Sequence, residues 1–304
     1  MTYAILSDIH GNNPALLAAL ADAKAQGANE YILLGDYASR YPWSNDVVDT
    51  IKKLSPAHII CGNGEGYFYN MKKTNGGKSN QQYKPNQWSY DKLTEENLAY
   101  LLALPEKITI RGASNIYVSH SIDLFWQPGV EHIFHTIHFN NMMLQAPISH
   151  NEYLKCAREA LLSCPNAHAS VLSLPPGVHL FGHNHLQFHT ECEGRLFINP
   201  GSCGMAADWD ATAAYTLLTW KDDTWHVTER RVEYDLQAVA DGLITSGYHD
   251  YAPMWSDIVK QQTLTGKEYF GWFVTHLIDT AEALENTASE DEIWDKAVKT
   301  WRAP

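Results

Sequence analysis

The stretch "YAILSDIHGNNPALLAALADAKAQGANEYILLGD", residues 3–36, predicts the fold class because it holds a complete strand–helix–strand unit. Its apolar runs, residues 3–7 and 30–35, read as strands, and the segment between them reads as a helix. Asn13 is the expected cap of that helix, Pro14 suits its first turn, and Gly27 suits its end. A helix between two strands favours parallel strands in one sheet.

The same alternation continues along the chain. A second helix (residues 45–54) and a third strand (57–61) complete a βαβαβ order, which predicts a partly parallel sheet covered by helices. Residues 72–87 are polar and predict a mobile loop. A helix at 95–104 and two hairpin strands at 107–112 and 115–120 follow.

The remaining chain divides into three patterns. Residues 121–176 interrupt the strands and predict a cap insertion, with a helix near 152–162; its aromatics, such as Phe125 and Trp126, would narrow access to a site below. Strand patterns resume from 178 to 232, and from 235 the chain is helical. We therefore expect one domain over residues 1–234 and a helical extension, 235–304, packed on it.

Composition limits the partners. The 304 residues carry a formal net charge of −13, which argues against long nucleic acid as a partner. Small phosphate compounds remain open, because a bound metal can reverse the local field. Five cysteines without CxxC spacing read as reduced thiols, and the sequence has neither a signal-peptide pattern nor a long apolar run. These features predict a cytoplasmic protein without a membrane partner; oligomeric state is not predicted.

Five apolar runs are each followed by side chains that can bind a metal. These side chains are Asp8 and His10, Asp36, Asn63, His120, and His183 and His185. Strand ends in α/β sheets converge on one crevice, so the set predicts a single site. Its carboxylate, imidazole and amide donors suit Mn²⁺, Fe²⁺, Co²⁺ or Zn²⁺, and seven donors suffice for two ions about 3.5–4 Å apart. For Asn63 an ordinary turn is the alternative, and for His120 a role in the core.

The ordered motifs resemble those of the calcineurin-like metallophosphoesterases. The motifs are D-x-H (Asp8, His10), G-D (Asp36), G-N (Asn63), a strand-ending His120 and G-H-x-H (His183, His185), spread over residues 3–203. The resemblance implies an α/β fold in which helices flank a two-layer β sandwich. It also implies that Asp8, His10 and His185 bind one metal, that Asn63, His120 and His183 bind the other, and that Asp36 bridges both.

The resemblance further implies dinuclear-metal-dependent hydrolysis of phosphoric esters. Mn or Fe are the expected metals, with Zn, Co and Ni as alternatives. No side chain is assigned as the nucleophile, because the attacking group would be a hydroxide between the metals. Asn63 and His120 are candidate phosphate contacts. Glu65 either orients a histidine ligand or is an exposed loop residue.

Gly64 departs from the family pattern. Many members have histidine after G-N, and glycine can neither donate a proton nor carry charge. We therefore expect a phosphodiesterase or nucleotide pyrophosphohydrolase, acting on small substrates such as dinucleoside polyphosphates. The alternatives are a phosphomonoesterase, including a protein phosphatase, and a metal-binding scaffold without catalysis.

Overall fold

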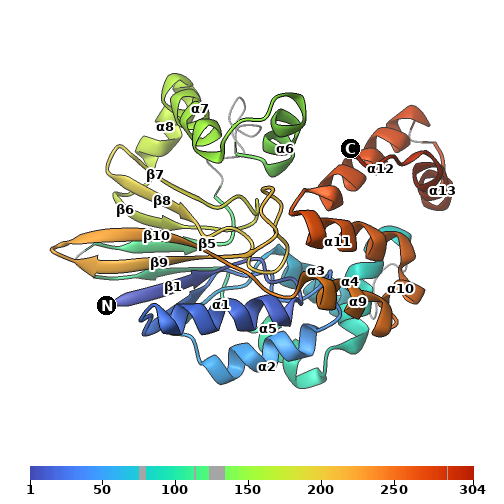
Figure 1. The fold of residues 1–304 in the computed structure, drawn as a ribbon, viewed down its shortest axis with the longest axis horizontal. Coiled ribbons are helices and arrows are strands. Elements are labelled where there is room, and N and C mark those ends of the chain that lie inside the picture. Colours follow the sequence, from blue (N-terminus) through green and yellow to red (C-terminus); the bar gives the residue numbers. More distant parts are fainter. Residues whose placement is uncertain (75–79, 113, 123–133, 286) are drawn as a thin grey trace.

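The computed structural model describes residues 1–74, 80–112, 114–122, 134–285 and 287–304. Two five-stranded sheets pack face to face, and helices cover their outer faces (Figure 1). The predicted two-layer sandwich flanked by helices is thereby confirmed. The strands are β1 (Thr2–Leu6), β2 (Glu30–Leu33), β3 (His58–Ile59), β4 (Lys107–Ile110), β5 (Ile116–Ser119), β6 (Gly177–Leu180), β7 (Phe188–Cys192), β8 (Arg195–Asn199), β9 (Ala213–Lys221) and β10 (Thr224–Val232).

Strand order brings the predicted site residues to one edge. The first sheet has the order β10-β9-β1-β2-β3, in which β1, β2 and β3 are parallel. The second has the order β4-β5-β6-β8-β7, in which β5, β6 and β8 are parallel. The strands that precede the candidate ligands are therefore parallel within each sheet, and their carboxyl ends lie together.

The alternation along β1 shows how the layers are held together. Tyr3 and Ile5 belong to the buried cluster between the two sheets, which also contains Val118 and Leu180. Ala4, on the opposite face, belongs to the cluster beneath the helices. Both faces of β1 are covered, which explains why its sequence is an apolar run and not an alternation of polar and apolar residues.

Helices account for the rest of the described chain. They are α1 (Asn13–Ala25), α2 (Ser44–Leu54), α3 (Asn63–Lys73), the 3₁₀ turn η1 (Gln81–Tyr83), α4 (Lys84–Lys92), α5 (Glu95–Leu102), α6 (Thr136–Gln145), α7 (His150–Ser163), α8 (Pro165–Ser173), α9 (Leu236–Thr245), α10 (Tyr248–Tyr251), α11 (Pro253–Thr265), α12 (Tyr269–Ala283) and α13 (Glu290–Thr300). None of the helices within the described ranges has the length and apolarity that a membrane crossing requires.

Two groups of helices lie outside the sandwich. The segment predicted as a cap forms α6, α7 and α8 over the second sheet (Figure 1). Phe139 and Tyr153 of these helices belong to the same buried cluster as Phe188 of β7. Phe125 and Trp126, which we expected to narrow the access, lie outside the described residues. Helices α9 to α13 form a separate aromatic cluster that includes Trp255 and Phe273 and reaches Tyr41 and Met205 beside the strand ends.

Three local predictions were wrong. Asn12, not Asn13, caps α1, because its side chain accepts the Ala15 N–H at 3.2 Å. The predicted loop at 72–87 is helical at both ends: α3 extends to Lys73 and α4 begins at Lys84, with Pro85 in its first turn. The third strand is shorter than predicted and covers only residues 58–59.

Candidate metal centre

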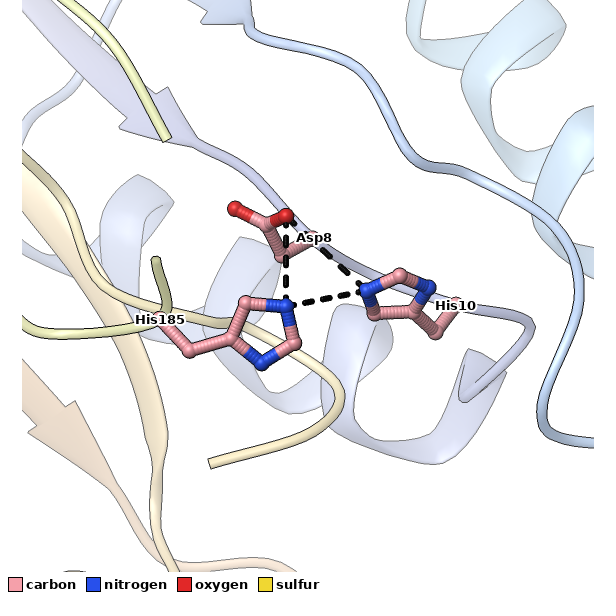
Figure 2. Close-up of side chains that lie close together, drawn as sticks. All are labelled: Asp8, His10 and His185. Atoms are coloured by element: carbon pink, nitrogen blue, oxygen red, sulfur yellow. Dashed lines mark hydrogen bonds and ion pairs between the residues drawn. The ribbon is translucent and has the colours of Figure 1, made fainter. Parts of the chain in front are cut away.

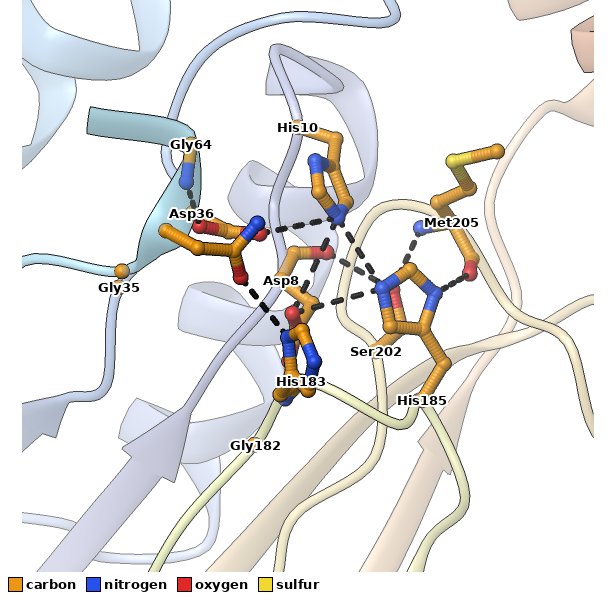
Figure 3. Close-up of polar contacts among 12 residues, drawn as sticks. Asp8, His10, Gly35, Asp36, Gly64, Gly182, His183, His185, Ser202 and Met205 are labelled. Atoms are coloured by element: carbon orange, nitrogen blue, oxygen red, sulfur yellow. Dashed lines mark hydrogen bonds and ion pairs between the residues drawn. The ribbon is translucent and has the colours of Figure 1, made fainter. Parts of the chain in front are cut away.

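The structure brings all seven predicted ligands together at the carboxyl ends of five strands (Figure 3, where Asp8, His10, Asp36, His183 and His185 are labelled). Four of them follow the first sheet: Asp8 and His10 after β1, Asp36 after β2, and Asn63 after β3. The other three follow the second sheet: His120 after β5, and His183 and His185 after β6. The site thus lies across the junction of the two layers.

Asp8, His10 and His185 form a first group of donors (Figure 2). The Nε2 atoms of His10 and His185 are 3.1 Å apart. Oδ1 of Asp8 lies 3.4 Å from Nε2 of His185 and 3.8 Å from Nε2 of His10. All three side chains point at one small volume, as a common ligand would require.

Asn63, His120 and His183 form a second group. Oδ1 of Asn63 lies 2.8 Å from Nδ1 of His183 and 3.1 Å from Nε2 of His120. Oδ2 of Asp36 lies between the two groups, 3.6 Å from Nε2 of His120 and 3.8 Å from Nε2 of His10. This placement suits a bridge, but Asp8 also faces both groups, with Oδ1 3.9 Å from Nε2 of His120. The bridging role of Asp36 stays a prediction.

The hydrogen bonds of the His120 and His185 rings indicate whether this group of residues can bind a cation. Nδ1 of His120 bonds to the Leu34 carbonyl at 2.7 Å, and Nδ1 of His185 to the Met205 carbonyl at 2.8 Å. A neutral ring that donates from Nδ1 carries a lone pair on Nε2. In that case the lone pair on Nε2 of His120 faces a lone pair on the Asn63 oxygen. Two lone pairs at this distance repel each other unless a proton or a cation lies between them.

The two carboxylates supply matching charge. Oδ1 of Asp8 is buried and, among the described residues, accepts no hydrogen bond. Burial disfavours its ionised form, but the facing imidazoles of His185 and His120 outweigh burial and lower the pKa of Asp8. Burial likewise opposes the imidazolium of His120, yet Asp36 and Asp8 raise its pKa to about 10. The donor set therefore demands positive charge at its centre, and it fits divalent ions of the predicted kind.

The backbone at the centre is strained. Five of the seven residues have left-handed φ values: Asp8 53°, His10 52°, Asp36 56°, His183 72° and His185 60°. Such conformations cost on the order of 1–3 kcal/mol each when the residue is not glycine, and they are concentrated at functional sites. The surrounding loops hold this geometry: the His10 N–H bonds to the Asp36 carbonyl at 2.9 Å.

Glu65 holds two of these loops together. Its buried carboxylate accepts three backbone N–H bonds, from Gly62 at 2.8 Å and from Asp36 and Tyr37 at 3.0 Å each. The prediction of an exposed Glu65 was therefore wrong, and its described hydrogen-bond partners are backbone N–H groups and not a histidine ring. Burial and the nearby Asp36 raise the pKa of Glu65 to about 7, against the effect of the three N–H donors.

Gly64 has a structural reason to be glycine. Its N–H donates to Oδ1 of Asp36 at 2.7 Å, and a Cβ at position 64 would come within 2.9 Å of the same oxygen. The close approach of helix α3 to Asp36 thus leaves no room for a side chain unless the carboxylate moves.

We expect Gly64→Ala to lower kcat/KM by about tenfold, because a shift of Asp36 by a fraction of an ångström costs less than the roughly 10²-fold of a full 1 Å displacement. Gly112→Ala is the matched control, since the nearest atom to a Cβ there is the Ser114 carbonyl oxygen at 3.7 Å, an ordinary contact. The measurement is steady-state kinetics of both variants, with the amount of bound metal determined for each. Equal activity of the two variants would show that Asp36 tolerates the added methyl.

Arg40 is a residue of the site that sequence reasoning missed. It follows Asp36 in the loop that runs beside His10, and the Tyr41 N–H bonds to the His10 carbonyl at 2.9 Å. The Arg40 guanidinium acts electrostatically on His10 and Asp36. Its described hydrogen-bond and ring partners are uncharged, namely the Asn86 side-chain oxygen at 3.2 Å and the ring of Phe270, whose centroid is 3.8 Å away, while Glu268 acts on it electrostatically together with Asp36. The guanidinium therefore has donors to spare beside the centre.

Comparisons with known proteins agree with this geometry. The sequence family described as the calcineurin-like phosphoesterase superfamily domain matches residues 1–223. An uncharacterised protein of Methanocaldococcus jannaschii is 25% identical over 264 residues, which are 79% of this chain and 91% of the relative. The solved metallophosphoesterase from Sphaerobacter thermophilus is 22% identical, with a TM-score of 0.60, over 88% of this chain and 100% of that one.

A hypothetical protein from Pyrococcus horikoshii has the same fold, with 19% identity and a TM-score of 0.56 over 85% of this chain and 97% of that one. The family match covers most of the chain, including every motif that forms the centre. The chain belongs to the calcineurin-like phosphoesterase superfamily, and it is a metal-dependent hydrolase of phosphoric esters.

Proposed function

We propose that the protein is a phosphodiesterase or nucleotide pyrophosphohydrolase that acts on small substrates with two divalent ions, Mn or Fe. Asp8, His10 and His185 hold one ion, Asn63, His120 and His183 the other, and Asp36 bridges them. The converging donors and the positive charge that they require at their centre support this ligand set. Five free thiols support the expected cytoplasmic location.

The observation that carries the proposal is the surroundings of Gly64. No side chain at this position can protonate a leaving group, and only the backbone N–H is present, already donated to Asp36. A positioned acid typically contributes about 10²–10⁴-fold. Substrates whose leaving group departs without help, such as phosphates or aryl alcohols, are therefore favoured over alkyl monoesters.

A groove beside the centre supports a substrate with a second substituent on phosphorus. It has a volume of about 470 Å³, and its lining includes Asn63 and His120 together with Tyr69, Leu101 and Leu104. Small-molecule sites commonly span about 300–1,000 Å³ with mostly apolar walls. A nucleoside or aryl group esterified to the phosphate fits a groove of this size and lining.

The roles of the side chains follow from their positions. When bound, the metal ions supply Lewis acidity and a nucleophile near neutral pH. The Gly64 N–H fixes Asp36, and Glu65 fixes the two loops that present Asp36 and Asn63. Arg40 binds a non-bridging phosphate oxygen with its free donors, as guanidinium groups do with planar oxyanions.

The test compares bis(p-nitrophenyl) phosphate with p-nitrophenyl phosphate, using protein reconstituted with Mn²⁺. We expect kcat/KM to be at least about tenfold higher for the diester, because its second p-nitrophenyl group can occupy the groove beside the centre, whereas both esters release the same alcohol. Faster turnover of the monoester would favour the phosphomonoesterase, and two bound ions without turnover of either ester would favour a scaffold.

A series of aryl and alkyl esters sharpens the same test. We expect kcat/KM to fall steeply as the pKa of the leaving alcohol rises, provided that chemistry limits the rate. A flat series would mean that another group already supplies the proton, and the argument from Gly64 would be wrong. Dinucleoside polyphosphates then identify whether nucleotides are the preferred substrates.

A further inference from the structure

The conformation of Arg40 indicates that its side chain matters. Ser39 and Arg40 have φ values of 79° and 75°, a left-handed pair in which glycine would be free of strain. The loop is held in this shape from both sides. The Tyr41 N–H bonds to the His10 carbonyl, and the Tyr41 hydroxyl lies 2.7 Å from Thr263 Oγ1 on α11. The chain thus has a large cationic residue at a position where the backbone conformation favours glycine.

The guanidinium of Arg40 rests on an aromatic stack from the C-terminal helices. Its carbon lies 3.8 Å from the centroid of the Phe270 ring on α12. The Phe270 ring stacks on Trp255 of α11, with centroids 4.7 Å apart and planes inclined by 26°. Trp255 is fully buried, and its ring N–H donates to the Gln81 carbonyl at 2.8 Å. The surface under Arg40 is therefore rigid.

The same helices also contact the loop of Met205 and Ala206 beside the centre. The buried Gln262 of α11 accepts the Phe270 N–H at 3.0 Å and donates to the Ala206 carbonyl at 3.1 Å. The neighbouring Met205 carbonyl is the acceptor for Nδ1 of His185. One side chain thus connects the residue under Arg40 to the loop that orients a predicted ligand.

We propose that Phe270 is a positioning residue that holds the Arg40 guanidinium toward the metal centre, so that helices α11 and α12 form one wall of the phosphate-binding site. The inference rests on the proposed function, because it assigns Arg40 to substrate phosphate. It extends the site beyond residues 1–223, the part of the chain that the family match covers.

The experiment measures inorganic phosphate binding by calorimetry, and as competitive inhibition, on full-length protein loaded with Mn²⁺. We expect Phe270→Leu to weaken phosphate binding by about 2- to 30-fold, the range that a lost cation–π contact implies. KM for the diester should rise by a similar factor while bound metal stays at the wild-type level. Phe270→Tyr keeps the aromatic face and should restore phosphate affinity to within about twofold of wild type.

Two further variants separate positioning from general damage. Leu277→Ala lies on the same helix and removes a buried side chain of the same cluster, so it should lower stability without changing phosphate affinity. Arg40→Gly relieves the left-handed strain and should lose phosphate affinity while remaining folded. In the double variant Arg40→Gly, Phe270→Leu, phosphate binding should be no weaker than with Arg40→Gly alone.

The outcomes distinguish this inference from the proposed function. Unchanged phosphate affinity in Phe270→Leu, or additive losses in the double variant, overturns the role of Phe270. The proposed function, hydrolysis of phosphoric esters, would still stand. Phosphate binding that depends on Phe270, in a protein that turns over no phosphoester, overturns the proposed function and supports the anion site. Failure of the metal-loaded wild type to bind phosphate overturns the inference.

Discussion

Replacing Asp36 by asparagine should reduce bound metal from two ions per chain to one or fewer and lower kcat/KM by more than about 100-fold. Loss of a partner that only orients a ligand typically costs about 10–100-fold, and Asp36 is placed between both donor groups. The asparagine oxygen can still accept the Gly64 N–H, so the loop should keep its shape and only the charge is removed.

Asp279→Asn, at an exposed position of α12, is the control for the same chemical change. Metal analysis after reconstitution with Mn²⁺ and steady-state kinetics on the diester give the two readouts. A protein that keeps two ions and most of its activity without the Asp36 carboxylate would exclude a bridging role. Asp8, whose Oδ1 also faces both donor groups, would then be the better candidate for the bridge.

Glu65→Gln is expected to weaken metal binding by about 10–100-fold and to lower the free energy of unfolding of the metal-free protein by about 1–3 kcal/mol. The carboxylate accepts backbone N–H bonds on both oxygens: Oε2 from Gly62 and Asp36, and Oε1 from Tyr37. A glutamine side chain has one acceptor oxygen and one amide group, so at least one of the three buried N–H groups would face another donor.

Glu159→Gln on α7 makes the same change at an exposed site with one ion pair of 4.0 Å, and it should alter stability by less than about 0.5 kcal/mol. Urea unfolding of the metal-free variants and metal titration of the folded ones separate the two effects. Metal affinity at the wild-type level in Glu65→Gln would show that the Asp36 and Asn63 loops keep their positions without the carboxylate.

The sequence predicted the strand ends well because the signal there is local. An apolar run that stops at Asp8 or Asp36 shows both the strand and the polar group that follows it. The sandwich itself came from the family resemblance, since periodicity cannot tell one sheet from two. The structure gathers all seven predicted ligands, and their binding of metal stays a prediction.

Residues whose role depends on distant contacts could not be predicted in this way. Helix α3 starts at Asn63 and contains Gly64 and Gly66, residues that favour turns, and its first turn is held by Glu65. Pro85 read as a loop signal, although proline also suits the first turn of a helix such as α4. Arg40 and Phe270 are 230 residues apart in the sequence and share no motif, and only the folded chain brings them into contact.

The division of the donors between two sheets has a consequence for folding. Four donors belong to one layer and three to the other, and neither layer holds a complete set for both ions. Ions held by the proposed ligand set would therefore act as cross-links at the open end of the sandwich, and the layers could not part there without releasing them. Because a ligand that binds only the native state shifts the folding equilibrium, the supply of metal would then set the folded fraction of this protein as well as its rate.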